Sequence, residues 1–230
     1  LLHPFDNILG TGSLVFNLGI SAFRVLWGFG FAALVGIPLG LAMGRILFVH
    51  QLFKPLIEVL RQLCPIAWIP FALAVFKTYT IPNLFGIRYS HTILDHIQIG
   101  MIFILFWGGF FPILLNTIHG VMSVKKLYID TALTLGAKPN QIFRKVILPA
   151  SLPAVMTGLR IGIGICWFVI IAAEMMPGSD AGIGYLIIYA YELAEMDLII
   201  AGMILIGLVG ALLSKGLELL SMNVYSWQAK

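Results

Sequence analysis

The sequence predicts an all-α integral membrane protein, and two observations carry that prediction. Of its 230 residues, 60% are hydrophobic and only 10% are charged, whereas a soluble domain usually has roughly 25% charged residues. In addition, five apolar segments are each long enough to cross about 30 Å of hydrocarbon, which takes around 20 helical residues. The formal net charge of +4 is too small to favour nucleic acid as a partner, so the lipid bilayer is the expected environment.

The predicted spans lie near residues 16–44, 55–77, 97–119, 153–176 and 197–219. Small residues spaced along a span let helix backbones approach closely, so the glycines of the first span indicate packing rather than a ligand site. These glycines are Gly28, Gly30, Gly36, Gly40 and Gly44. In the second span, Pro65 and Pro70 each remove a backbone hydrogen bond, and we expect each to bend the helix. Residues 177–197 are predicted to form a re-entrant or surface helix.

Apart from Lys77 and Arg88, the basic residues of the loops gather on one side of the membrane if every predicted span crosses it. They are Arg45, Lys54, Lys125, Lys126, Lys138, Arg144, Lys145, Lys215 and Lys230. Because loops rich in lysine and arginine stay in the cytoplasm, we expect a cytoplasmic C-terminus and an outer N-terminus. With no targeting signal at the start, this topology leads us to expect a sixth, N-terminal helix upstream of Leu1. No repeat or linker indicates a second domain, so residues 1–230 are predicted to form one transmembrane domain.

A polar, basic insert of about residues 124–150 separates the third and fourth predicted spans. Leu127 to Leu135 is predicted to be a short helix, because small and apolar residues share one of its faces. Gly136 follows, where a helix often ends in a left-handed residue that glycine adopts at little cost. Pro139 then fits the first position of a second helix.

The second predicted helix of the insert is amphipathic. Gln141, Arg144 and Lys145 lie opposite an apolar stripe, and we expect Leu148-Pro149 to end the helix before the next span. The stripe consists of Ile142, Phe143, Val146 and Ile147. The residues alone leave two alternatives open: the insert docks on a partner through its apolar face, or it lies on lipid headgroups.

The insert resembles the EAA loop of ABC-importer permeases, whose pattern is Glu-Ala-Ala, three residues, Gly, nine residues, Ile, one residue and Leu-Pro. The spacing matches in full, with three conservative replacements in the letters. The matching positions are Asp130, Thr131, Ala132, Gly136, Val146, Leu148 and Pro149. Further stretches, such as "GLRIGIGICWFVIIAAEM" and "AGIGYLI", are similar to permease subunits of nitrate, bicarbonate, taurine and alkanesulfonate importers, and the similarity covers most of residues 22–190.

This resemblance implies the type I ABC importer fold in a multi-pass protein of the bacterial plasma membrane. It also implies that the insert couples the pore to an ATPase, within a complex of two permease copies, two ABC ATPase subunits and an extracytoplasmic solute-binding protein. The chain has no G-x-x-x-x-G-K-[ST] phosphate loop. We therefore expect no catalysis and no cofactor in this chain, with ATP and Mg²⁺ on the partner ATPases. The expected substrate is a small anion: nitrate, nitrite or bicarbonate first, alkanesulfonate or taurine next.

Charged side chains inside a span cost on the order of 2.5–3.5 kcal/mol each on insertion scales, so they need a partner or a function. The candidates for a substrate pathway are Arg24, Arg61, Trp68, Arg160 and Glu174. Each has a structural alternative. Arg24 would snorkel to headgroups, while Arg61 and Arg160 would snorkel or form an internal ion pair. Glu174 would pair with an arginine or cap backbone groups, and Trp68 would anchor the interface.

The alternative function is a secondary transporter or channel that acts without an ATPase. It would need coupling groups within the membrane, such as paired carboxylates, and Glu174 is the only acidic residue well inside a predicted span. No metal site is predicted. The spacing of His91, Asp95 and His96 permits one, but polar residues gathered in one exposed loop are usually just solvated.

Overall fold

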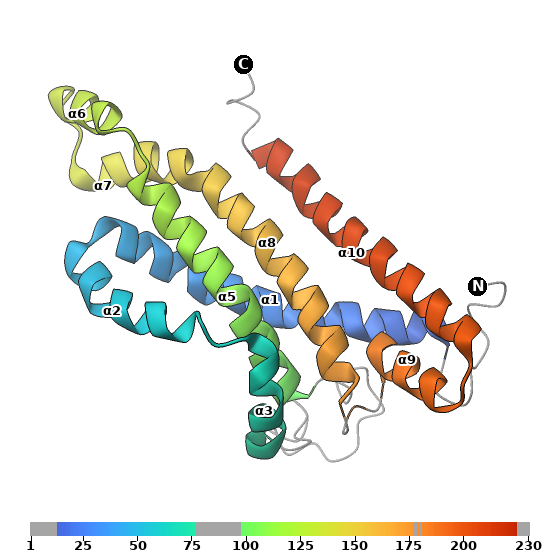
Figure 1. The fold of residues 1–230 in the computed structure, drawn as a ribbon. Coiled ribbons are helices and arrows are strands. Elements are labelled where there is room, and N and C mark those ends of the chain that lie inside the picture. The colour runs from blue at the N-terminus through green and yellow to red at the C-terminus, as the bar shows by residue number, and fades with distance from the viewer. Residues whose placement is uncertain (1–12, 77–97, 177–178, 180, 225–230) are drawn as a thin grey trace, which may run out of the picture.

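The computed structural model describes residues 13–76, 98–176, 179 and 181–224, and this part of the chain is helical (Figure 1). Three long helices form its centre: α1 (Leu14–Arg45), α5 (Ile99–Met122) and α8 (Leu148–Glu174). A fourth, α10 (Met196–Val224), packs on α8 and on the short α9 (Ile183–Glu192). All four long helices are long and apolar enough to cross a membrane. The first, third, fourth and fifth predicted spans are therefore confirmed as helices.

The glycines of α1 bring it into close contact with α5. Cβ atoms built at Gly36 and Gly40 would lie 3.2 Å from Ile113 Cγ2 and 2.7 Å from Thr117 Cβ, so there is almost no room for a side chain. The packing prediction holds for Gly28, Gly36, Gly40 and Gly44, which all face α5. Gly30 takes no part in this contact: it has open space around it within this chain and lies in a shallow groove on the outer surface of α1.

The α5–α8 contact is equally close and completes a three-helix core. A Cβ at Gly158 would lie 2.8 Å from Asn116 Cβ, and one at Gly120 would lie 2.7 Å from Ala154 Cβ. On α8, Cys166 donates to the Leu105 carbonyl at 3.2 Å. Short backbone distances of this kind replace the hydrophobic effect as the source of helix association in lipid.

The second predicted span is not one straight helix. It consists of α2 (Leu47–Leu60), a 3₁₀ turn (Pro65–Trp68) and α3 (Ile69–Phe76), with a bend of 82° between the two parts. Cys64 has the extended backbone (φ −61°, ψ 128°) that a following proline imposes, so the helix cannot continue into Pro65. Pro70 lies in the first turn of α3, where its missing N–H breaks no helical bond, so our expectation that both prolines bend the chain is wrong for Pro70.

The insert contains α6 (Lys126–Thr134) and α7 (Pro139–Ile142), at the opposite end of the bundle from α9 (Figure 1). The expectation that Leu148-Pro149 ends the second helix is wrong. From Ile142 the helix continues through a π-helical turn (Phe143–Ile147) into α8. The Leu148 N–H bonds to the Phe143 carbonyl, five residues back, and this wider turn accommodates a proline at 149 without a break.

The close packing of α1 on α5 makes a prediction about matched glycines. Gly40→Ala should lower the free energy of unfolding by about 1–3 kcal/mol, because the new methyl group overpacks against Thr117. Gly30→Ala should be neutral or stabilise by up to about 1 kcal/mol, because it faces open space and alanine favours a helix. Thermal unfolding of the two purified variants in detergent measures both, and equal stability of the two would contradict this account of the interface.

Candidate functional site

The first helix of the insert ends in a Schellman motif built around Gly136. The Gly136 N–H bonds to the Leu133 carbonyl at 2.9 Å, and the Ala137 N–H bonds to the Ala132 carbonyl at 3.0 Å. Gly136 has φ +76°, the left-handed conformation that glycine adopts most easily. The predicted helix and its terminating glycine are confirmed.

The second helix begins at Pro139, as predicted. Its cap residue, Lys138, cannot accept a hydrogen bond through its side chain, but its backbone N–H donates to Gln141 Oε1 at 2.8 Å. This is the reciprocal half of a capping box, and it fixes the direction in which the chain enters the helix.

A groove of about 560 Å³ runs between α6 and the start of α8. Four of the seven residues that match the EAA-loop pattern line this groove. The other three are Gly136 at the bend, the exposed Asp130 and the half-buried Leu148. Its lining consists of Tyr128, Thr131, Ala132, Leu135, Lys145, Val146, Pro149 and Ala150. The spacing of the pattern thus corresponds to one continuous concave surface.

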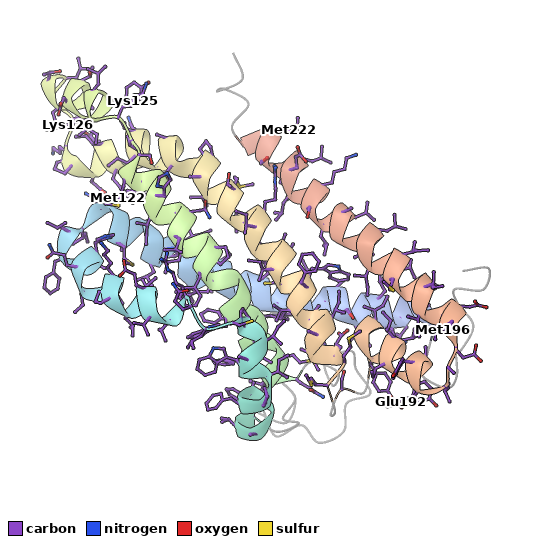
Figure 2. The ribbon with its side chains drawn as sticks, in the orientation of Figure 1. Met122, Lys125, Lys126, Glu192, Met196 and Met222 are labelled. Carbon is purple, nitrogen blue, oxygen red and sulfur yellow. The ribbon has the colours of Figure 1, made fainter. Side chains whose placement is uncertain are left out.

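Large apolar side chains of the insert are left exposed by the described part of the chain, at the groove and beside it. Leu135 is 83% exposed and Leu127 is 69% exposed, while Lys125 and Lys126 lie at the start of α6 (Figure 2). An apolar face with a basic border on a short, projecting helix is typical of a surface that another molecule covers.

A buried polar network joins α1 to the segment that leads into α9. Arg24 Nη1 lies 2.8 Å from Glu174 Oε1 and donates to the Ala181 carbonyl at 2.8 Å. Ser21 Oγ donates to the Glu174 carboxylate, with distances of 2.9 and 2.8 Å to its two oxygens. Arg24 and Glu174 are both fully buried. The predicted pairing of Glu174 with an arginine is confirmed, whereas the expectation that Arg24 snorkels to headgroups is wrong, because its charge is satisfied inside the protein.

Backbone groups complete the network. The Gly184 N–H donates to Glu174 Oε2 at 3.1 Å, the Gly182 N–H to Asn17 Oδ1 at 2.9 Å, and the Ile183 N–H to Ser21 Oγ at 2.9 Å. These donors belong to the first turn of α9, so Glu174 and α1 together cap that helix. Gly182 has φ +125° and contacts the Glu174 carboxyl group, which leaves no room for a side chain.

Sequence reasoning missed Asn17 and Ser21. Both are fully buried and lie on the same face of α1 as Arg24. The signal was present in the spacing, because residues 17, 21 and 24 follow the i, i+4, i+7 pattern of one helix face. A polar stripe on an otherwise apolar helix indicates a buried network rather than a single snorkelling charge.

The remaining pathway candidates lie elsewhere. Arg61 is exposed at the break after α2, and Arg160 is exposed on α8 with its Nη2 3.5 Å from Ser221 Oγ of α10. Trp68 is half-buried after the break and packs on Trp107 of α5, with ring centroids 4.9 Å apart. The structure does not bring these three residues and the Arg24–Glu174 pair into one site.

No group of three or more potential metal ligands occurs within the described part of the chain. His91, Asp95 and His96 lie outside the described residues.

The described part of the chain thus combines helices that are able to cross a membrane with an exposed helical insert at one end. The family model described as "Binding-protein-dependent transport system inner membrane component" matches residues 36–223. The chain belongs to this family, and it is a permease subunit of the ABC importers.

Three relatives are similar in sequence over most of their length. A protein of Methanocaldococcus jannaschii named as an ABC transporter permease is 49% identical over 99% of this chain and 79% of its own length. The nitrate import permease protein NrtB of Synechocystis sp. is 35% identical over 100% of this chain and 77% of its own. The bicarbonate transport system permease protein CmpB of Synechococcus elongatus is 36% identical over 94% of this chain and 71% of its own length.

The fold also matches a solved structure. A chain of the MetNI methionine ABC transporter, described in inward-facing conformations, superposes with a TM-score of 0.71 over 95% of this chain and 98% of that one, at 17% sequence identity. This likeness establishes the type I ABC importer fold.

The buried network makes a prediction about stability. Glu174→Gln should destabilise the protein by about 3–5 kcal/mol, because it leaves the Arg24 guanidinium buried without a counter-charge. The double variant Arg24→Leu with Glu174→Gln should recover part of that loss, because no uncompensated charge remains. Thermal unfolding in detergent compares the two, and a double variant no more stable than Glu174→Gln would show that the ion pair is not the source of the effect.

Proposed function

We propose that this permease imports a small anion, with the inorganic anions nitrate, nitrite or bicarbonate as the first candidates and the organic alkanesulfonates or taurine next. One observation carries the proposal: two relatives at 35% and 36% identity, each covering at least 94% of this chain, are named for nitrate and for bicarbonate. Both anions are small, planar and oxygen-rich, so one pore design suits either.

The charged residues of the helices differ in their surroundings, and this difference supports different roles for them. Arg24 is neutralised by Glu174 and holds the helices together, so the exposed guanidinium groups of Arg61 and Arg160 are the better candidates for drawing an anion through the pore. Trp68, half-buried beside the break between α2 and α3, supplies an aromatic wall there. In this proposal the break is where the pathway narrows.

The insert is the proposed coupling element. Two permease copies pair in the membrane, and each groove between α6 and α8 receives a surface of one ABC ATPase subunit, which binds ATP and Mg²⁺. The insert and the C-terminus face the cytoplasm, in accord with the basic residues at that end. A solute-binding protein delivers the anion from outside. ATP-driven closure of the ATPase pair pushes the inserts together and opens the pore outward, and hydrolysis returns it to the inward-facing state.

A secondary transporter has less support. Glu174, the one acidic residue well inside a predicted span, is fully engaged with Arg24, Ser21 and Gly184. A carboxylate held in this way is not available to carry protons across the membrane.

Uptake by the complex reconstituted in proteoliposomes, with its ATPase and binding protein, tests the proposal. Nitrate, bicarbonate and taurine are supplied in turn, and we expect uptake of one inorganic anion that requires ATP. Gly136→Val should abolish most uptake, because a non-glycine residue in the left-handed region costs about 1–2 kcal/mol and a β-branched one more.

Gly136→Asn is the matched control. Asparagine tolerates the left-handed conformation, and the space around Gly136 is open, so this variant should keep most of the uptake. Uptake without ATP, or equal uptake by the two variants, would contradict the coupling role of the insert. Uptake of taurine alone would contradict the choice of an inorganic anion.

A further inference from the structure

The end of α1 that lies next to the insert contacts it through the side chain of Arg45. Its guanidinium carbon lies 4.6 Å from the centre of the Phe143 ring, in the geometry of a cation–π contact. Its Nη2 also donates to the Pro139 carbonyl at 3.4 Å. Arg45 is the last residue of α1, while Pro139 and Phe143 lie one helical turn apart in the insert.

Both contacts fall on the turn that begins the second half of the insert. The Phe143 N–H donates to the same Pro139 carbonyl that Arg45 reaches. The arginine therefore contacts both ends of a single helical turn, the carbonyl of Pro139 and the ring of Phe143. Phe143 is also the first residue of the π-helical turn that joins the insert to α8. Turns of this kind are irregular and occur frequently at functional sites.

Towards its other end, α1 is held by the buried polar network. Arg24 and Ser21 bind Glu174 of α8 and the first turn of α9. The distance along the helix from Arg24 to Arg45 is about 30 Å, at 1.5 Å per residue. Pro38 interrupts the hydrogen bonding of α1, but Gly36 and Gly40 on either side of it pack directly on α5, which holds the helix in place. Figure 1 shows α1 extending between the insert and α9.

We propose that Arg45 is a positioning residue that ties the insert to α1, so that displacement of the insert moves α1 and, through the Arg24–Glu174 pair, the α9 segment at the far end. This inference rests on the proposed function, because it concerns how the movement of the insert reaches the pore. The flat guanidinium matters as much as its charge, since it stacks on the Phe143 ring while one nitrogen reaches the carbonyl.

The test is the number of anions taken up per ATP hydrolysed by the reconstituted complex. Arg45→Ala should lower this ratio about two- to fivefold, because an exposed cation–π contact is weak and the insert stays joined to α8. The amount of ATPase that copurifies should not change, because the groove itself is intact. Arg45→Lys keeps the positive charge at the end of α1 but cannot stack in the same way, and it should also lower the ratio.

Substitutions on the partner ring separate the contact from the charge. Phe143→Tyr keeps an aromatic face and should retain the wild-type ratio, whereas Phe143→Leu should lower it as much as Arg45→Ala does. The double variant Arg45→Ala with Phe143→Leu should be no worse than either single one, because both remove the same contact. Lys54→Ala removes an exposed positive charge of α2 and serves as the control, with an unchanged ratio.

Three results would overturn the inference: a wild-type ratio in Arg45→Lys, additive losses in the double variant, or loss of ATPase binding in proportion to loss of uptake. The first result would mean that only the positive charge of Arg45 matters. The second would mean that Arg45 and Phe143 act independently. The third would mean that Arg45 is needed for assembly with the ATPase. A wild-type complex that takes up the anion without ATP would instead overturn the proposed function, and this inference with it.

Discussion

The close approach of α1, α5 and α8 is the constraint on which the rest of the structure depends. Lipid offers no hydrophobic drive for helix association, so contact distance between backbones has to supply it. Glycines on all three helices make this possible, and a Cβ atom at Gly40 or Gly120 would already be too close to its neighbour. Once these helices are fixed, Arg24 of α1 faces Glu174 of α8, and the insert projects from the shared end of α5 and α8.

The buried ion pair follows from the same low-dielectric surroundings. A lone charge inside the membrane is costly, and a paired one still loses its hydration, so both partners need further hydrogen bonds. Glu174 receives them from Ser21 and from the Gly184 backbone, and Arg24 donates to the Ala181 carbonyl. Because these partners come from α1 and from the start of α9, the pair helps to fix the position of this short helix, whose apolar face is also buried.

Much of the fold could be predicted from the sequence because its signals are local. Span length, glycine spacing and the end of α6 at Gly136 depend on neighbours within a few residues. The bend after α2 was signalled by Pro65, but its size depends on how α3 packs on α5. The behaviour of Pro149 depends on a π-helical turn, which hydrophobic periodicity does not reveal. The groove residues were found as a pattern, whereas the concave surface they form depends on the angle between α6 and α8.

The fate of the charged residues was the least predictable, because a charge in a span is equally compatible with a headgroup, a partner or a substrate. Only three-dimensional proximity separates these cases, and here it divides the candidates into two kinds. Arg24 and Glu174 form an ion pair that holds α1, α8 and α9 together, whereas the side chains of Arg61 and Arg160 are exposed. The insert meets this framework in three places: it follows α5 along the chain, it continues as a helix into α8, and Arg45 at the end of α1 contacts it. A force on the insert is therefore applied to all three core helices at once, and a core packed this tightly transmits it by moving as a body rather than by deforming.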